Sequence, residues 1–440
     1  MSVLKVDFNN TYGKIRPMHA TNNGPVKSDA FGANLLDGYG TWRAAGIPYA
    51  RTHDSSFSEA YGGEHTVDVH AIFPDFDADV NDPESYDFAI TDEYLKSIIE
   101  CGTKVFYRLG TKIEHEVKKY NTLPPKDFKK WAEVCEHIIM HYTEGWAEGF
   151  KHDIEYWEIW NEPDLQADDE KSKCTWGGTL DDFCRFYEIA ATHLKSRFPH
   201  LKIGGPASAS IKDRVEKFLS YISRKNIPLD FFSWHCYGAT TEKFYDLASF
   251  MRTKLDEYGF EETESILNEW NYIKSWDEFI YSVKQIISLK GAAFTAACMC
   301  GFQNDTSVDM LMYYDARPSK FNGLFDYYTN EPLKGYYPFK MFDVLYRLGE
   351  ACKCEKEDCD IYAAAAKCGE ETAVMISRYT DDDSATDIKK IKLEICGGAD
   401  KYEMFVVDEE RDCERFGVIA QGSVIEMKSN MVVLLKSVGV

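Results

Sequence analysis

Residues 156–164 read YWEIWNEPD, which places two tryptophans, two glutamates and an aspartate within nine positions. This run is too apolar for a solvated loop, and it carries too many carboxylates for an ordinary core strand. We interpret it as a strand with a functional end, where Glu162 lies just before Pro163. Proline ends the strand because it has no amide hydrogen to donate to a sheet. The aromatic neighbours are expected to desolvate Glu162 and to raise the pKa of its carboxyl group.

Short apolar runs alternate with longer helical patterns over roughly the first 340 residues. The intervening patterns have the spacing of amphipathic helices, as in DEYLKSIIECG at residues 92–102, which ends at a glycine. Repeated strand–helix units of this kind predict an α/β fold, a (β/α)8 TIM barrel with eight parallel strands. The eight runs interpreted as strands are residues 13–22, 46–54, 103–110, 154–164, 201–209, 229–238, 264–272 and 292–305.

The pattern changes after about residue 345, where strand-like runs follow one another without a long helix between them. Turns rich in glycine or aspartate, such as TDDDS at residues 380–384, separate these runs. Such a pattern predicts a small antiparallel β-sandwich domain. We therefore divide the chain into a catalytic barrel at residues 10–345 and an accessory β-sandwich at residues 346–440, and residues 1–9 are a candidate additional strand of the sandwich.

The charge balance argues against several classes of partner. The chain carries 73 acidic and 50 basic side chains, for a formal net charge of −23. A surface of this kind repels nucleic acid and anionic lipid, so we expect no nucleic-acid partner and no membrane partner. No uninterrupted apolar run of about 18 residues is present, which also argues against a membrane span. The sequence leaves open whether copies of the chain form a homo-oligomer.

The cysteines indicate a reducing compartment and no metal centre. There are 13 cysteines, an odd number scattered over a long chain, which is typical of reduced thiols and not of a disulfide framework. The first residues show no basic region followed by an apolar run, so we see no secretory signal and expect a cytoplasmic protein. The densest cysteine cluster, CKCEKEDC at residues 352–359, has no common zinc-ligand spacing. We expect no metal site and no cofactor.

Polar residues at the carboxyl ends of barrel strands normally face the active site. The fourth predicted strand ends at Asn161 and Glu162, and the seventh ends at Glu269. These two strands lie on opposite sides of a ring of eight, so their carboxylates can meet across the barrel mouth. The other polar strand ends are His19 and Asn22, Arg51 and His53, His235 and Tyr237, and Gln303 and Asn304.

A carboxylate pair at a barrel mouth suits glycoside hydrolysis. One carboxyl group must be protonated to release the leaving oxygen, and the other must be ionised to attack the anomeric carbon. Asn161 is placed where its amide could bond the 2-hydroxyl of the sugar. Glu158 shares a strand face with Glu162 because strand side chains alternate with a period of two. We interpret Glu158 as the structural partner of a barrel arginine or lysine.

The segments WEIWNEPD (157–164) and ILNEWNY (266–272) resemble the acid/base and nucleophile signatures of clan A glycoside hydrolases. They are most similar to family 39, which includes β-xylosidases and α-L-iduronidases. RTHD (51–54) corresponds to an Arg-Phe-His turn of that family, and FNGLFDYYTNEPLKGYYPFKMF (321–342) resembles its late hairpin and aromatic helix. The resemblance covers roughly residues 10–345, and a C-terminal β-domain is also expected of the family.

The resemblance implies a retaining enzyme with Glu162 as acid/base, Glu269 as nucleophile and Asn161 as the 2-hydroxyl ligand. It implies in addition that Tyr237 bonds the nucleophile, because the aromatic residue of the sixth strand commonly does so in clan A. The full set of residues assigned to substrate binding is Asn161, His53, His235, Tyr237, His19, Asn22 and Trp270.

Three differences from the family pattern leave the substrate open: Asp164 after the proline, Asn268 before the nucleophile, and the divergent loop at residues 55–82. The leading substrate is an oligosaccharide or glycoside with a β-linked pentose such as xylose. An α-L-arabinofuranosidase or another clan A exo-glycosidase is the alternative enzyme. A barrel that binds carbohydrate without cleaving it is the alternative of another class, and the presence of both glutamates argues against it.

Overall fold

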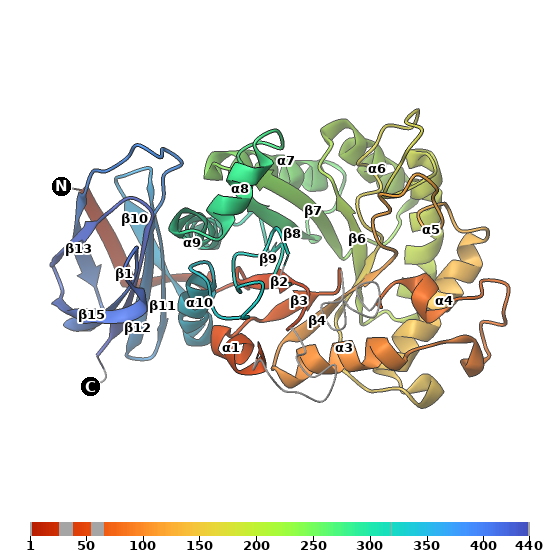
Figure 1. The fold of residues 1–440 in the computed structure, drawn as a ribbon, viewed down its shortest axis with the longest axis horizontal. Helices are drawn as coiled ribbons and strands as arrows, with labels where there is room; N and C mark the ends of the chain where they lie inside the picture. Colours follow the sequence, from red (N-terminus) through yellow and green to blue (C-terminus); the bar gives the residue numbers. More distant parts are fainter. Residues whose placement is uncertain (1, 26–37, 54–65, 318, 439–440) are drawn as a thin grey trace.

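The structure is a computed structural model that describes residues 2–25, 38–53, 66–317 and 319–438. A closed barrel of eight parallel strands, β2 to β9 in chain order, forms the larger unit, and a nine-stranded sheet forms the smaller one (Figure 1). Both ends of the chain lie in the smaller unit, at one end of the molecule (Figure 1). The predicted combination of a TIM barrel and a C-terminal β-domain is confirmed.

The barrel strands are short and alternate with helices that surround them. The strands are β2 (Ala20–Asn22), β3 (Tyr49–Arg51), β4 (Lys104–Leu109), β5 (Tyr156–Ile159), β6 (Lys202–Ser208), β7 (Phe231–Gly238), β8 (Glu264–Tyr272) and β9 (Met310–Tyr313). The helices are α1 (Gly38–Ala45), α2 (Val69–Ile72), α3 (Ala89–Glu100), α4 (Phe128–Thr143), α5 (Leu180–Arg197), α6 (Lys212–Lys225), α7 (Thr241–Glu257), α8 (Phe279–Ile286), α9 (Leu289–Asn304) and α10 (Tyr336–Leu348). Short 3-10 turns lie at Pro83–Ser85 and Trp146–Glu148.

The inside of the barrel is layered along its axis. Side chains near the amino ends of the strands form a small apolar cluster that includes Phe106, Tyr156, Phe231 and Ile266. Two positions further along their strands, Tyr156 is followed by Glu158, Phe231 by Ser233 and Ile266 by Asn268, all of them buried. Because side chains alternate along a strand, these polar groups also point into the barrel. They form a polar layer, the floor of the site, beneath the carboxyl ends of the strands.

One predicted strand is wrong. Residues 292–305, expected to be the eighth strand, lie almost entirely in the helix α9, and the eighth strand is β9, whose sequence is MLMY. The side chains of α9 are buried nearly all round because it lies between the barrel and the β-domain, packed on β8, β11 and β12. A helix buried on every side shows no polar face, so its sequence loses the amphipathic period.

The β-domain is one curled sheet. Its strands have the order β15-β14-β17-β12-β11-β10-β1-β13-β16, and β1 (Ser2–Lys14) pairs antiparallel with β10 and parallel with β13. The N-terminal strand therefore lies inside this sheet and runs past the predicted residue 9. The remaining strands are β10 (Glu350–Lys356), β11 (Ile361–Cys368), β12 (Glu371–Arg378), β13 (Lys389–Cys396), β14 (Lys401–Val407), β15 (Asp412–Ala420), β16 (Val424–Met427) and β17 (Met431–Ser437).

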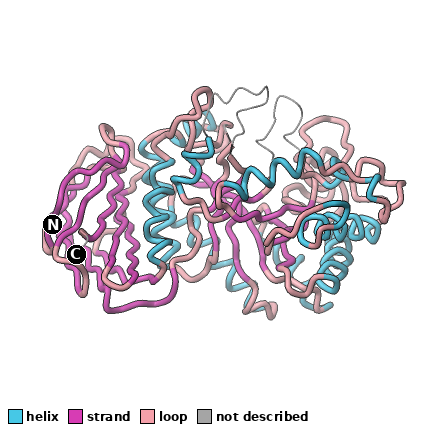
Figure 2. The backbone as a smooth tube through the Cα atoms, turned by 90° about the horizontal axis from the view of Figure 1, so that it is seen from below, coloured by secondary structure: helices cyan, strands magenta, loops and turns pink. Residues whose placement is uncertain are grey.

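The curled sheet has two apolar faces. Side chains from both halves of the sheet, such as Val6, Ile376 and Leu393, form a core inside the curl, as in a sandwich. The opposite face of β11 and β12 packs against α9 and α10, which separate the sheet from the barrel (Figure 2). Ala363 belongs to the inner core and Ala364 to the interface with the barrel. Burial on both faces explains why IYAAAAKC shows no alternation.

Within the described ranges, no single helix has the length and apolar character needed to cross a membrane. The pair α8 and α9, bent by 77°, passes that test together by length and composition.

Candidate active site

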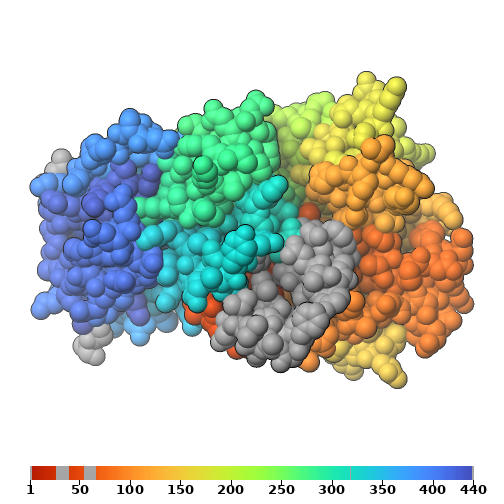
Figure 3. Space-filling model, viewed as in Figure 1, coloured from red at the N-terminus to blue at the C-terminus, as the bar shows by residue number. Residues whose placement is uncertain are grey.

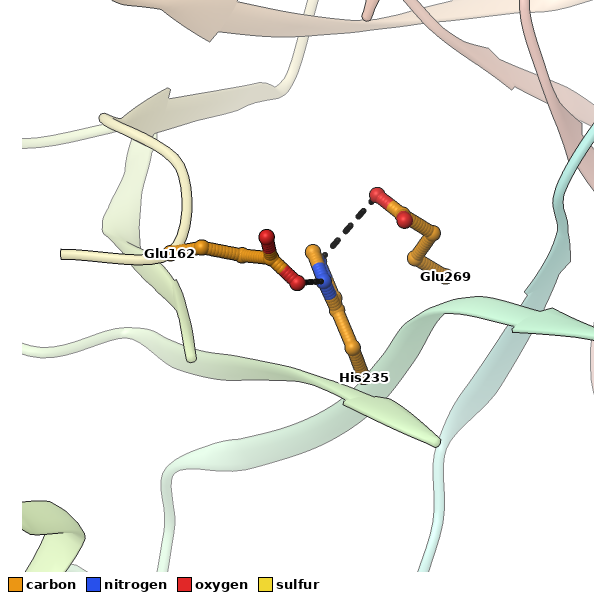
Figure 4. A group of neighbouring side chains, drawn as sticks. All are labelled: Glu162, His235 and Glu269. Atoms are coloured by element: carbon orange, nitrogen blue, oxygen red, sulfur yellow. Dashed lines mark hydrogen bonds and ion pairs between the residues drawn. The ribbon is translucent and has the colours of Figure 1, made fainter. Parts of the chain in front are cut away.

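Glu162 follows β5 in a tight turn at the carboxyl end of the barrel. The backbone of this turn is left-handed at Trp160 (φ 75°) and at Glu162 (φ 49°), which is uncommon for residues other than glycine. The amide of Glu162 donates to the carbonyl of Ala207 in β6 at 2.8 Å, and Thr175 Oγ1 donates to the Glu162 carbonyl at 2.7 Å. These bonds fix the backbone, and the side chain points at the ring of His235 (Figure 4).

The two tryptophans before Glu162 face away from the site. Trp157 donates its Nε1 proton to the carbonyl of Ile154 and stacks on Tyr107 at 4.8 Å between ring centroids. The ring of Trp160 packs against Trp131 and Trp176 in the helical layer. The pleat turns Trp157 outward and Glu158 inward, and the left-handed backbone at Trp160, just beyond β5, turns that ring outward as well. The expectation that these rings desolvate Glu162 is therefore wrong.

A β-bulge in β8 positions the second carboxylate. The pairing of β8 with β7 and with β9 shifts register between Leu267 and Trp270. A bulge lets two successive residues face the same side of a strand. Both Asn268 and Glu269 therefore face the barrel interior, where Asn268 Nδ2 donates to Glu158 Oε1 at 2.6 Å.

Glu269 is buried among donors and cations. Tyr237 donates its hydroxyl proton to Glu269 Oε1 at 2.5 Å, and Arg51 Nη1 lies 3.4 Å from Oε2. His53 Nε2 lies 3.8 Å from the same oxygen. Burial alone would raise the pKa of Glu269, but the charges of His235, His53 and Arg51 and the Tyr237 hydrogen bond outweigh it and lower that pKa. These contacts therefore favour the ionised form of the Glu269 carboxylate.

His235 lies between the two carboxylates, which both point toward its ring (Figure 4). Its Nδ1 is 2.7 Å from Glu162 Oε1, and its Nε2 is 3.5 Å from Glu269 Oε2. Burial would lower the pKa of His235, yet the charge of Glu269 and the hydrogen bond to Glu162 outweigh it and raise that pKa. Only a protonated imidazole can donate from both nitrogens, so the ring is suited to bridge the pair.

The three side chains also form a potential metal-binding group. One ligand atom from each of Glu162, His235 and Glu269 lies within 4.8 Å of the others. A zinc ion would need about 2.0–2.2 Å to each nitrogen or oxygen ligand. In this structure His235 Nδ1 and Glu162 Oε1 are instead joined by a direct hydrogen bond at 2.7 Å.

Arg51 organises the floor beneath the carboxylates. Its Nε pairs with Glu158 Oε2 at 2.6 Å, Nη1 donates to Asn22 Oδ1 at 2.9 Å, and Nη2 donates to Asn161 Oδ1 at 2.7 Å. Arg51 and Glu158 are completely buried. The prediction that Glu158 pairs with a barrel arginine or lysine is confirmed. A guanidinium with several fixed partners holds the neighbouring amides and Glu269 in fixed positions.

The side-chain amide nitrogen of Asn161 is available to bind a ligand. Its Oδ1 accepts from Arg51, whereas its buried Nδ2 has no hydrogen-bond partner among the described residues. A donor of this kind suits a sugar hydroxyl. Asn22 differs, because its Nδ2 donates to the Asn268 carbonyl at 2.7 Å, which ties β2 to β8 beneath the site.

His19 and Trp270 lie outside this cluster. The ring of His19 packs against Phe342 and Tyr346 of α10, because His19 precedes β2 and so lies at the other end of the barrel. The indole of Trp270 turns outward and packs against Phe294 of α9. The assignment of these two residues to substrate contacts is not supported by their positions.

Gln303 and Asn304 also lie elsewhere, at the end of α9. Gln303 bonds Arg16 and Lys14, and Asn304 donates to the carbonyl of Ala363 in the β-domain.

Three residues of the site had no assigned role from sequence: Arg51, Ser233 and Asn268. Arg51 could have been found, because it ends a predicted strand opposite an inward-facing Glu158. The inward turn of Asn268 depends on the bulge, for which the sequence gives no signal.

Comparisons with known proteins identify related sequences and structures. The sequence model described as "Glycosyl hydrolases family 39" matches residues 54–361. A β-xylosidase of Caldicellulosiruptor saccharolyticus is 29% identical over 164 residues, and a β-xylosidase of Geobacillus stearothermophilus is 27% identical over 164 residues. These matches take in 35% and 34% of the chain and 31% of each relative, so the chain matches about a third of the relatives' length.

Solved structures share the whole architecture. A glucosidase from Croceicoccus marinus has a TM-score of 0.79 at 22% identity, over 99% of this chain and 98% of the other. A β-xylosidase from Caulobacter crescentus has a TM-score of 0.71 at 16% identity, over 99% of both chains. Identities this low establish the fold alone. The family match, in contrast, takes in well over half of the sequence, and the chain belongs to family 39 of the glycosyl hydrolases.

Proposed function

We propose that the chain hydrolyses glycosides with retention of anomeric configuration, and that its substrate is a β-linked pentoside such as a β-xyloside. The observation that carries the proposal is the pair Glu162 and Glu269, which face each other across His235 with Glu269 held ionised. An ionised carboxylate beside a second carboxyl group that can give and take a proton is the minimum set for double displacement.

In the first step, the Glu269 carboxylate attacks the anomeric carbon while Glu162 gives its proton to the leaving oxygen. The bond between the sugar and the leaving group breaks, and a covalent ester between the sugar and Glu269 forms. The amide Nδ2 of Asn161 is free to donate to the 2-hydroxyl of the same sugar. In the second step, Glu162 takes a proton from water, the water attacks the anomeric carbon, and the ester is cleaved.

The spacing of the carboxylates supports retention. One oxygen from each glutamate lies within 4.8 Å of the other. Retaining enzymes hold their carboxyl groups about 5–5.5 Å apart, whereas inverting enzymes need about 6.5–9.5 Å to admit a water molecule. A short separation of this kind favours direct attack by Glu269 over attack by a water held between Glu269 and the sugar.

The preference for xylosides is supported by the relatives from Caldicellulosiruptor saccharolyticus and Geobacillus stearothermophilus, both of which are β-xylosidases. A panel of nitrophenyl glycosides tests it, with β-xyloside, α-L-arabinofuranoside and β-glucoside as the main members. We expect the highest kcat/KM on the β-xyloside. A higher value on the arabinofuranoside or the glucoside would contradict the substrate proposal, and colour release from none of them would favour a carbohydrate-binding barrel.

We also propose that the protein acts in the cytosol, on oligosaccharides that have already been imported. All 13 cysteines are free thiols, and Cys359, Cys368 and Cys396 are exposed. Reducing conditions preserve such thiols. Fractionation of cells that make the protein should place it with soluble cytosolic markers, and recovery from the culture medium would contradict this.

Replacing Tyr237 by phenylalanine should lower kcat on the preferred nitrophenyl glycoside by about 10- to 100-fold, because a hydrogen bond to a charged group contributes about 1.5–3 kcal/mol. Burial and the Glu269 charge raise the pKa of Tyr237, so its hydroxyl stays a donor. The control is Tyr221→Phe, because Tyr221 makes the same kind of bond to Glu188 at 2.5 Å, on the helical surface. A Tyr237→Phe variant as active as Tyr221→Phe would disprove the contact's role.

Replacing His235 by asparagine should move the acidic limb of the kcat/KM profile to higher pH. Glu269 attacks only when it is ionised, which requires a pH above its pKa. The His235 cation is the largest of the charges that lower the pKa of Glu269, so its removal raises that pKa. We expect a shift of about one pH unit or more, as is usual for an opposite charge at this distance. His193→Asn, which removes a histidine from a surface pair with Glu136 at 2.6 Å, is the control. An acidic limb that stays in place would contradict the account.

A further inference from the structure

The loop between β12 and β13 belongs to the C-terminal sheet but contacts the substrate side of the barrel. Tyr379 donates its hydroxyl proton to the carbonyl of Ala239, directly after β7, at 2.5 Å. Tyr272, the last residue of β8, donates to Asp381 Oδ1 at 2.6 Å. The loop thus contacts the chain just beyond the two strands that carry His235, Tyr237 and Glu269. In the space-filling view, the C-terminal unit abuts the barrel segments continuously (Figure 3).

A buried lysine strengthens this junction. Lys290, at the start of α9, is 6% exposed and donates to the Asp381 carbonyl at 2.8 Å and to Asp383 Oδ1. Asp383 Oδ2 accepts from the hydroxyl of Tyr281 in α8 at 2.8 Å. Burial would lower the pKa of Lys290, but the hydrogen bonds with Asp383 and Tyr281 and the charge of Asp381 outweigh it and raise that pKa. The lysine therefore stays charged, and loss of its partners would leave a buried cation.

Residues 273–279 connect these anchors and carry an exposed aromatic side chain. Trp276 is 61% exposed, and its ring centroid lies 5.5 Å from that of Tyr237 in an edge-on arrangement. Trp276 also stacks on Phe279 at 6.0 Å. The Tyr237 hydroxyl bonds the carboxylate of Glu269, the proposed nucleophile. The Tyr237 ring therefore lies between that carboxylate and the exposed indole of Trp276.

We propose that the segment of residues 379–383 is a positioning element of the active site, which holds residues 273–279 so that Trp276 presents a sugar-binding surface beside the nucleophile. This inference rests on the proposed function. Flat aromatic faces pack well on the apolar faces of sugar rings, and binding sites are commonly lined by such side chains. Loops are mobile unless other contacts fix them, so a binding residue on a loop needs support from outside.

The first test is hydrogen exchange of residues 273–281 in the full-length protein. The variant Asp381→Ala/Asp383→Ala removes both carboxylates that hold the segment. The matched control is Asp382→Ala, because Asp382 accepts hydrogen bonds from Ser384 within the same loop. We expect exchange in residues 273–281 to rise by about tenfold or more in the double variant and to stay unchanged in the control, since local opening sets exchange rates. Equal protection in both variants would overturn the anchoring.

The second test asks whether the loop acts through Trp276. The double variant and Trp276→Ala should each raise KM by about fivefold or more while kcat changes little, because each loses sugar binding and not chemistry. Titration of active sites with a slowly hydrolysed fluoroglycoside measures the fraction of active protein. It therefore distinguishes weaker sugar binding from a loss of folded protein. Combining the changes should raise KM no further, since both remove the same contact.

Trp276→Tyr should keep most of the affinity because it retains an aromatic face. Additive effects of Trp276→Ala and the double variant, or a fall in kcat alone, would overturn the proposed route through Trp276. The exchange experiment needs no turnover. Hydrogen exchange therefore tests whether residues 379–383 hold residues 273–281, even if no glycoside is cleaved. A failure to cleave any glycoside would count against the proposed function and not against this contact.

Discussion

Glu269→Ala should lower kcat/KM on every glycoside by about four orders of magnitude or more, because the variant has no other group to attack the anomeric carbon. The loss should be equally large on substrates with good and poor leaving groups, since both need the nucleophile. Steady-state assays on a nitrophenyl glycoside and on a disaccharide measure it. The position of Glu269 in the bulge, with Tyr237 and Arg51 on its oxygens, is the basis of this expectation.

A control for this variant lies on the same strand. Glu264 begins β8 at the opposite end of the barrel, where it pairs with Lys202 at 2.6 Å. Glu264→Ala should stay within a few-fold of the parent, because an ion pair near the surface contributes only about 0–1 kcal/mol. If Glu269→Ala kept a tenth of the parent activity, the nucleophile would have to be another residue.

Glu162→Ala should show a loss that depends on the leaving group. On a disaccharide, the loss of proton donation should cost about 10²- to 10⁴-fold in kcat/KM, which is the usual contribution of a general acid. An activated nitrophenol leaves with little help, so the same variant should retain far more activity on a nitrophenyl glycoside. Equal losses on the two substrates would contradict the assignment of Glu162 as the acid.

Azide should then rescue Glu162→Ala on the nitrophenyl substrate. The anion attacks the ester on Glu269 without needing a general base, and two displacements retain the configuration. The product from a β-glycoside is therefore the β-glycosyl azide, which nuclear magnetic resonance identifies. If azide produced the same β-adduct from Glu269→Ala but none from Glu162→Ala, the two roles would be reversed.

The carboxylates were predictable from sequence because their signals are local. Glu162 and Glu269 each follow an apolar strand, and the barrel rule brings such strand ends together. The pairing of Arg51 with Glu158 also follows from the period of the strand. The outward direction of Trp157 and Trp160 was misjudged from the same segment, because composition shows neither the pleat at Trp157 nor the left-handed turn at Trp160.

Features that depend on packing between distant segments were not predictable. The helix α9 lacks an amphipathic pattern because it is covered on both sides, by the barrel and by the β-domain. The bulge at Asn268 exists only in the paired strand, and Trp270 turns outward because of it. The contact of Asp381 with Tyr272 joins residues more than a hundred positions apart, and TDDDS alone reads as a solvated turn.

The central claim is that Glu269 forms a covalent bond with the sugar. A 2-deoxy-2-fluoro glycoside with an activated leaving group slows the second step, so the ester accumulates when an enzyme uses double displacement. Peptide mapping of the trapped protein by mass spectrometry should place one sugar on the peptide that contains Glu269, and Glu269→Ala should carry none. A sugar attached to the Glu162 peptide, or hydrolysis of the active substrate with inverted configuration and no adduct, would contradict the account.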